Sequence, residues 1–334
     1  MGGGMKKSLI AWCLFLAGIA LASVLAVHAG AGAVVRSFAS IGIDRFLAVC
    51  VLQLLSLALC GAAWRCVARE TTLIACVLAR WIRDGASNLV GFIPAIGEAI
   101  SARVLTQLGV TSAGAAAAGT IVDVAAEALA QAAFTLTGLV LLWPHLKVAQ
   151  TGEWLLIVAG TLIPIFLMVG ISRFPWALRL VERLGSQLAG VLGVAPGGAP
   201  LNIAAAVKAI YRRRGQVFAG IGFHLAGWAL SGVQVWVAVQ GLAHPLGFGD
   251  CFALAALVSA ARSAFFVVPW AAGVQEGGFV LVGLALGMHA PEAIALSLVL
   301  RARDVLVGAP AILLWYLSEA RTGVRQSRMS QPSR

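Results

Sequence analysis

Long apolar runs dominate the chain, and short groups of charged residues separate them. An α-helix needs roughly 20 apolar residues to cross the hydrocarbon core of a bilayer. The pattern therefore predicts an all-α polytopic membrane protein with about six full spans. The runs of spanning length lie at about 8–27, 46–64, 113–142, 153–172, 217–241 and 294–318.

Two further apolar regions, at about 72–110 and 251–290, are each interrupted by a proline, a glycine and a glutamate. Proline breaks a helix, and glycine loosens the backbone that remains. A glutamate in hydrocarbon costs free energy unless a partner or water meets it. We therefore expect two re-entrant helical hairpins, whose irregular backbone protein or water must cover. The interruptions read Gly91-Phe92-Ile93-Pro94-Ala95-Ile96-Gly97-Glu98 and Pro269-Trp270-Ala271-Ala272-Gly273-Val274-Gln275-Glu276.

The composition agrees with a membrane protein, because 60% of the 334 residues are hydrophobic and 11% are charged. The net charge of +11 does not indicate nucleic-acid binding, since the basic residues lie between apolar runs. Lysine and arginine concentrate in cytoplasmic loops, so their distribution places both termini in the cytoplasm. The basic residues expected on that side include Arg65, Arg69, Arg80 and Arg83, the segment 173–216 and the tail 321–334.

This topology predicts one integral membrane domain over residues 1–320 that contains two inverted units. The first broken region enters the membrane from the cytoplasm, and the second enters from outside. The units 72–142 and 251–318 are then oppositely oriented, as in the inverted repeats of alternating-access transporters. Within the cytoplasmic segment 173–216, residues 201–214 are either an amphipathic helix on the inner leaflet or an ordinary basic loop.

A polar stripe runs along the helix that follows the first broken region. Thr120, Asp123, Glu127, Gln131 and Thr135 are spaced three or four residues apart, so they share one face. Lipid does not suit these groups, and the stripe is expected to face other helices, a cavity or a proton path. Asp123 and Glu127 are like charges one turn apart, which calls for a proton on one of them or a cation nearby.

The helix after the second broken region carries a similar stripe of Ser297, Arg301, Asp304 and Gly308. Arg301 and Asp304 have the i,i+3 spacing at which side chains pair on a helix. Such a pair would serve either lipid movement or only the packing of helices.

The two broken regions have charged residues at the same spacing. Glu98 precedes Asp123 by 25 residues, and Glu276 precedes Arg301 by 25. The acids Glu98, Asp123, Glu127, Glu276 and Asp304 nearly balance the bases Arg103, Arg262, Arg301 and Arg303, which predicts an internal ion-pair network. The residues expected to line a transport path are Pro94, Gly97, Glu98, Arg103, Asp123, Glu127, Gln131, Arg262, Pro269, Gly273, Glu276, Arg301 and Asp304.

Other chemistry finds little support in the residue spacing. The five histidines are scattered, without a His-x-x-x-His or His/Glu cluster, so no metal site is predicted. No nucleophile–base pair or phosphate-cradling loop has a recognisable spacing. A membrane transferase that uses Glu98 or Asp123 as a base therefore ranks last, and we expect neither enzymatic activity nor a cofactor.

Four motifs together resemble the flippase-like transmembrane domain of lysylphosphatidylglycerol synthases and their stand-alone relatives. They are Gly91-x-x-Pro94-x-x-Gly97-Glu98, the Asp123/Glu127 helix, Pro269-x-x-x-Gly273-x-x-Glu276-Gly277-Gly278 and Arg301-x-x-Asp304. The resemblance extends over about 8–318, and the stretches 120–142 and 268–286 are most similar to the hopanoid-biosynthesis-associated HpnL branch. It implies a bacterial inner-membrane protein that moves or presents a lipid. In the synthases a separate soluble domain carries aminoacyl transfer, so the resemblance implies no enzymatic activity here.

The leading hypothesis is a lipid translocase whose two hairpin tips meet near the bilayer midplane. Glu98 and Glu276 would act as gating or proton-coupling carboxylates, Asp123, Glu127 and Gln131 would line the path, and Arg301 with Asp304 would complete it. Its partner would be a hopanoid, which the resemblance implies, or a phospholipid. The alternative is a membrane scaffold that moves no lipid and instead binds a lipid-synthesising enzyme.

Overall fold

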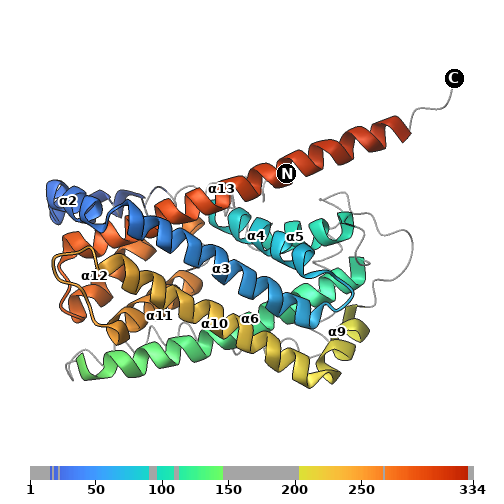
Figure 1. Cartoon of the computed structure of the whole chain (residues 1–334), viewed down its shortest axis with the longest axis horizontal. Coiled ribbons are helices and arrows are strands. Elements are labelled where there is room, and N and C mark those ends of the chain that lie inside the picture. The colour runs from blue at the N-terminus through green and yellow to red at the C-terminus, as the bar shows by residue number, and fades with distance from the viewer. Residues whose placement is uncertain are drawn as a thin grey trace, which may run out of the picture.

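The chain folds into a bundle whose long helices lie side by side along one axis (Figure 1). Every regular element in the described part of the chain is a helix, so the predicted all-α class is confirmed. The computed structural model describes residues 16, 19–21, 23–89, 96–108, 113–145, 203–265 and 268–329. In chain order, the helices in this part are α2 (Ala31–Ile41), α3 (Ile43–Val67), α4 (Leu73–Leu89), α5 (Ile96–Gln107), α6 (Ala113–Leu142), η1 (Trp143–His145), α9 (Ile203–Arg212), α10 (Arg214–Val239), α11 (Phe248–Ala264), η3 (Pro269–Ala271), α12 (Val274–Ala285) and α13 (Ala290–Met329).

Three of the predicted spans coincide with helices that are long and apolar enough to cross a membrane. These helices are α3, α10 and the segment Gly114–His145, which joins α6 to η1. A fourth candidate is Ile19–His28 followed by α2, a pair bent by 94°. The run at 294–318 lies inside α13, whereas 153–172 lies outside the described residues. The number of full spans therefore stays a prediction.

Each broken region consists of two short helices. In the first region α4 has 17 residues and α5 has 12, and in the second α11 has 17 and α12 has 12. At 1.5 Å per residue these lengths are roughly 26 and 18 Å, which is shorter than the hydrocarbon core of about 30 Å. Within each region the two helices pack against each other. The two-helix form agrees with the proline and glycine signals, while re-entry into the membrane stays a prediction.

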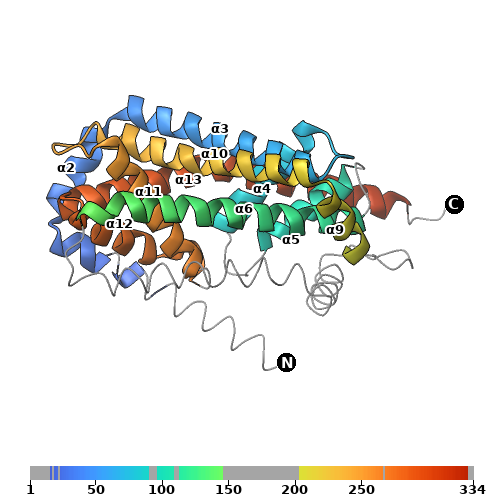
Figure 2. The ribbon, with the colours of Figure 1, turned by 90° about the horizontal axis from the view of Figure 1, so that it is seen from below.

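The packing of one half of the chain repeats in the other half. Helix α3 runs antiparallel to α10, because Gly220 near the start of α10 faces Ala63 near the end of α3, and Gly241 just after α10 faces Ile41 just before α3. Helix α4 packs on α13, and α11 packs on α6. Exchanging α3 with α10, α4 with α11, α5 with α12 and α6 with α13 therefore preserves the main contacts. Figure 2 shows α3, α10 and α6 as neighbouring layers.

Helix α9 lies within the predicted basic segment 173–216 and forms part of the stretch 201–214. Its apolar residues Ile203 and Val207 are buried in a core cluster beside residues of α6. The expected amphipathic helix is therefore present, and protein covers these apolar side chains, while the position of α9 on the inner leaflet stays a prediction. At the other end of the chain, α13 continues as a helix through most of the predicted basic tail.

Candidate functional site

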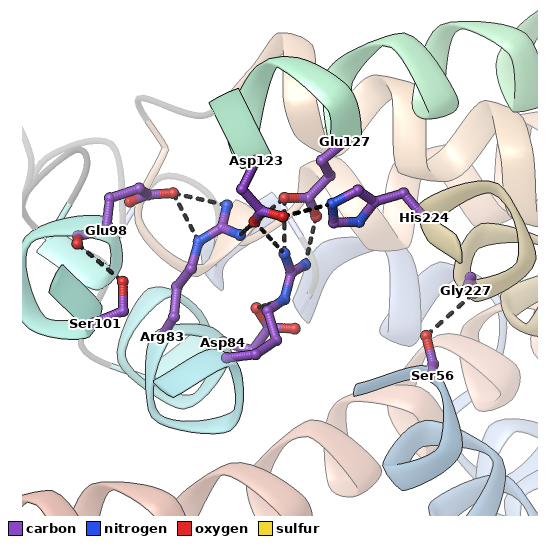
Figure 3. Close-up of polar contacts among 10 residues, drawn as sticks. Ser56, Arg83, Asp84, Glu98, Ser101, Asp123, Glu127, His224 and Gly227 are labelled. Carbon is purple, nitrogen blue, oxygen red and sulfur yellow. Dashed lines mark hydrogen bonds and ion pairs between the residues drawn. The ribbon is translucent and has the colours of Figure 1, made fainter. Parts of the chain in front are cut away.

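Four helices direct ionisable side chains into one buried group, which we call the first charge cluster (Figure 3). Helix α4 contributes the two arginines and one carboxylate, α5 and α6 contribute three carboxylates, and α10 contributes a histidine. Burial of so many charges inside an apolar bundle requires that they satisfy one another. The members are Arg80, Arg83, Asp84, Glu98, Asp123, Glu127 and His224.

The two arginines of α4 hold the first charge cluster together. They are three residues apart, so their side chains leave α4 on the same face. Arg80 binds Glu127 through both terminal nitrogens, with one contact of 2.9 Å between Nη1 and Oε2. Arg83 donates to Glu127 Oε2 at 2.8 Å and to Glu98 Oε1 at 3.0 Å. Both guanidiniums also lie 3.8 Å from Asp123 Oδ2.

The position of these arginines corrects the sequence analysis. Arg80 and Arg83 were expected among the cytoplasmic charges, yet they are only 5% and 8% exposed on the inner face of α4. The sequence does not distinguish a buried arginine near the end of a span from an arginine in a loop. The expected cation beside Asp123 and Glu127 is present, since both guanidiniums contact both carboxylates.

His224 joins the cluster from α10, where sequence reasoning did not find it. Its imidazole is fully buried, and Nε2 lies 2.9 Å from Asp123 Oδ1. A single histidine in an apolar run carries no local signal, because its partner is 101 residues away. Asp123 is therefore held between an imidazole and the two guanidiniums.

The first charge cluster carries an excess of negative charge. Four carboxylates face two guanidiniums, which leaves a formal charge of −2, or −1 when His224 is protonated. The side chains of Asp84 and Glu98 are 25% and 28% exposed, whereas Asp123 is 2% exposed. An excess of buried carboxylates favours the uptake of a proton or a cation. The more exposed carboxylates of Asp84 and Glu98 form the accessible edge of the cluster.

A second charge cluster lies at the second break. Trp270 and Ala271 have φ angles of 58° and 45°, a left-handed conformation that is rare for residues with a side chain. Arg301 of α13 donates from Nη1 to Trp270 O at 2.9 Å and from Nη2 to Ala271 O at 3.1 Å. Its guanidinium also lies 4.7 Å from the centroid of the Trp270 ring. Arg301 therefore satisfies backbone carbonyls that the break leaves outside a regular helix.

Glu276 completes the second charge cluster. It is 3% exposed and accepts hydrogen bonds from Arg301 Nη2 at 2.9 Å and from the backbone N–H of Gly273 at 2.9 Å. Ser297 Oγ donates to the same carboxylate at 3.3 Å. The predicted Arg301–Asp304 pair is thus wrong, because the long arginine side chain reaches across to α12 and to the carbonyls of the break.

Asp304 belongs to a third group, which joins α13 to α11 and α4. Arg303 donates to Asp304 Oδ1 at 2.6 and 3.0 Å, and Arg262 lies 3.8 Å from Oδ2. Arg262 also donates to Asn88 of α4 at 3.2 Å. A small cavity of about 10 Å³, close to the size of one water molecule, separates this group from the first charge cluster. It is lined by Gln53, Leu57, Trp81, Asp84, Gly85, Asn88, Asp304, Val307 and Gly308.

Two residues expected to line the transport path lie apart from the clusters. Arg103 instead binds Glu319 of α13, with contacts of 2.6 and 2.7 Å. Gln131 donates to Ser259 O at 3.3 Å and to Ser263 Oγ, so it links α6 to α11. The predicted ion-pair network is therefore divided into several separate groups, because the side chains lie at different helix–helix interfaces.

The proline and glycine positions have different outcomes. Pro94 lies outside the described residues. Pro269 begins η3, and Gly273 immediately precedes α12 with a φ of 74°. A Cβ at Gly97 would overlap Ser87 Oγ and lie 2.6 Å from the carbonyl oxygen of Arg83, so this glycine permits close contact of α5 with α4.

Long apolar helices that enclose buried ion pairs define the chain as a polytopic α-helical membrane protein. The family model described as the lysylphosphatidylglycerol synthase TM region matches residues 14–311, and the chain belongs to this family. No curated protein and no solved structure matches the chain. The predicted family is confirmed, and the HpnL branch stays a prediction.

Proposed function

We propose that this protein is a lipid translocase that works by alternating access between two inverted units. The observation that carries the proposal is a glutamate at the same helix position after each break. Glu98 and Glu276 are each the third residue of the short helix after a break, and each pairs with an arginine of a neighbouring helix. Paired broken helices with ionisable groups at the break are typical of transporter binding sites. The chain would lie in the bacterial inner membrane with both termini in the cytoplasm.

The repeated packing supports an inverted repeat. The antiparallel contact of α3 with α10 relates the two halves, and the first helix of each broken region packs on the long helix of the other half. A movement of one unit against the other therefore changes the contacts of α4 with α13 and of α11 with α6. Helix α4 carries Arg80, Arg83 and Asp84 of the first charge cluster and also contacts η3 at the second, so the proposed movement of α4 and the charge state of both clusters are coupled.

The small cavity lined by residues of α3, α4 and α13 is evidence that this structure is a closed conformation. Its volume of about 10 Å³ excludes a lipid headgroup. Opening it would separate α4 from α13 and break the hydrogen bond of 2.7 Å from Trp81 Nε1 to Val307 O. It would also strain the link between Arg262 and Asn88. Alternating access would thus open and close the molecule along this line of contacts.

A second cavity suits the binding of a lipid with a polar or anionic headgroup. It has a volume of about 220 Å³ and is lined by Arg65, Cys66, Arg69 and Gln216 where α3 ends and α10 begins. Arginine pairs well with phosphate because its planar fork offers several N–H donors. In the proposed topology this cavity opens at the cytoplasmic end, where a phospholipid headgroup would first bind. A hopanoid with a polar head remains the substrate that the HpnL resemblance implies.

The proposal is tested by lipid translocation in proteoliposomes that contain the purified full-length protein. The test compares wild type with Glu98→Gln, Glu276→Gln and the double variant, using a phospholipid reporter and a hopanoid reporter. Glu319→Gln is the comparison variant, since it neutralises the α13 partner of Arg103 and leaves the carboxylates that follow the two breaks in place. We expect the double variant to lose movement of the preferred reporter while Glu319→Gln retains it.

Folding must be measured on the same samples, because removing one partner of a buried pair can cost about 3–5 kcal/mol. Glu276→Gln combined with Arg301→Gln leaves no unpaired charge but also removes the donors to the carbonyls of Trp270 and Ala271, so its folding is measured with that of the other variants. Normal movement by folded double variants would contradict the translocase proposal. If folded wild type moves neither reporter but captures a lipid-synthesising enzyme, the scaffold alternative takes its place.

A further inference from the structure

A cluster of metal-ligating side chains lies at the opposite end of the bundle from α9 (Figure 1). His244 lies in the loop between α10 and α11, His289 precedes α13, and Glu292 lies in the first turn of α13. One ligand atom from each of the three residues lies within 4.8 Å of the others. None of these residues belongs to the charge clusters described above.

The geometry of the three side chains suits a single cation. His244 Nδ1 lies 3.2 Å from Glu292 Oε1, and His289 Nδ1 lies 3.4 Å from Glu292 Oε2. Ligand bonds of 2.0–2.2 Å in a tetrahedral zinc site place neighbouring ligand atoms roughly 3.3–3.5 Å apart. Both imidazoles are 63% exposed, so their rings have room to adjust around an ion.

A helix cap explains only part of this arrangement. Glu292 accepts the backbone N–H of His289 at 3.2 Å, which is the usual role of an acidic residue in the first turn. The cap does not require His244, which comes from a loop 48 residues away and turns Nδ1 toward the same carboxylate. The two rings lie 4.5 Å apart, so two imidazoles from separate parts of the chain converge on one carboxylate.

We propose that His244, His289 and Glu292 bind a first-row divalent transition metal, with Zn²⁺ the ion that best suits the set. Two histidines and one glutamate form a known zinc ligand set that leaves a fourth position open to water. Glu292 is 6% exposed and already held by two backbone N–H groups, so one ligand is fixed in place. The ion would tie the α10–α11 loop to the start of α13.

The inference is tested by titrating the purified full-length protein in detergent with Zn²⁺ and following heat and stoichiometry. Co²⁺ absorption in the visible range would report the coordination geometry. We expect one ion per chain and at least roughly tenfold weaker binding by His244→Ala or His289→Ala. Mg²⁺ and Ca²⁺ should not compete, because they prefer sites made of oxygen ligands.

The matched control is His145→Ala. His145 is 38% exposed and lies 3.6 Å from Asp250, so it offers a surface histidine–carboxylate pair without a second histidine. Its loss should leave Zn²⁺ binding unchanged. The proposal is overturned if wild type takes up no ion at micromolar Zn²⁺, or if the double His244→Ala/His289→Ala variant keeps wild-type stoichiometry and affinity. Exposed histidines tolerate alanine, and each variant is checked for helical content and a single oligomeric species.

Discussion

At the scale of residues, arginine holds both charge clusters together in a way that lysine would not. Arg80 and Arg83 each bind carboxylates from more than one direction, and Arg301 binds a carboxylate, two carbonyls and the face of an indole ring. The planar guanidinium supplies five donors in a fixed fork, whereas an ammonium is a compact, strongly hydrated charge. The geometry of the breaks therefore depends on the shape of arginine as well as its charge.

This difference predicts the effect of Arg301→Lys. The variant keeps the charge beside Glu276 but leaves the carbonyls of Trp270 and Ala271 without their donors. Each buried acceptor left unsatisfied costs about 1–3 kcal/mol, so we expect a clear loss of unfolding free energy in detergent. Arg103→Lys is the matched control, because the guanidinium of Arg103 binds the carboxylate of Glu319, so this substitution takes no donor away from the backbone of the break. Equal losses in the two variants would refute this account of the break.

Single residues also show what the sequence could predict about the site. Glu98 and Glu276 were identified because each stands beside a proline and a glycine that break its own helix. Arg80 and His224 were misassigned or missed, since their partners Glu127 and Asp123 come from other helices. Local signals find residues at a break, but the partner of a buried charge depends on tertiary packing.

At the scale of elements, glycine sets how closely the helices approach. A Cβ at Gly138 of α6 would overlap the Cβ of Ala256 on α11, and a Cβ at Gly85 of α4 would lie 2.9 Å from the carbonyl oxygen of Gly308 on α13. Small residues allow such contacts between membrane helices, where van der Waals packing drives association. Both contacts join a broken region to the long helix of the other half.

The close contact of α6 with α11 predicts the effect of Gly138→Val. The added side chain would push the two helices apart, and overpacking typically costs about 1–3 kcal/mol. Gly222→Val in α10 is the control, because in the described part of the chain no atom beyond its own stretch of helix lies within 4 Å of the added Cβ. Thermal unfolding in detergent should show a lower Tm for Gly138→Val than for the control. If both variants unfold at the same temperature, the glycine does not set the helix separation.

The positions of the helices along the chain were easier to predict than the packing of one helix against another. Hydrophobic runs located α3, α6 and α10, and the proline–glycine signals located two pairs of short helices. Periodicity also found α9, but it described an apolar face without saying what covers that face. Ile203 and Val207 pack on protein because α9 lies beside α6, which is a fact of topology that local pattern does not contain.

At the scale of the whole molecule, the helix contacts that cross from one half to the other determine which movements are available. The first helix of each broken region packs on the long helix of the other half, so the contact of α4 with α13 and that of α11 with α6 must change together if the units move. Contacts inside one half, such as α3 with α6, would stay fixed. The proposed mechanism therefore distinguishes links between halves from links within a half.

A reversible cross-link tests this distinction. A Cβ at Gly85 would lie 3.3 Å from the Cβ of Ala311, and a Cβ at Gly119 would lie 3.5 Å from the Cβ of Ala68. Both are close to the separation of roughly 3.5–4.5 Å that a disulfide requires. In a background without native cysteines, oxidised Gly85→Cys/Ala311→Cys joins α4 to α13 and should abolish lipid movement. Oxidised Gly119→Cys/Ala68→Cys joins α6 to the end of α3 and should leave it intact.

Reduction of the same samples provides the control for folding. A side chain at Gly85 is tight against Gly308, so the reduced variant shows any cost of the substitution itself. Recovery of lipid movement after reduction would attribute the block to the link between the halves. If lipid moves as fast in the oxidised α4–α13 variant as in the same variant after reduction, the halves do not separate along this contact. Alternating access would then have to occur without relative movement of α4 and α13, and the coupling proposed for the two charge clusters would fail with it.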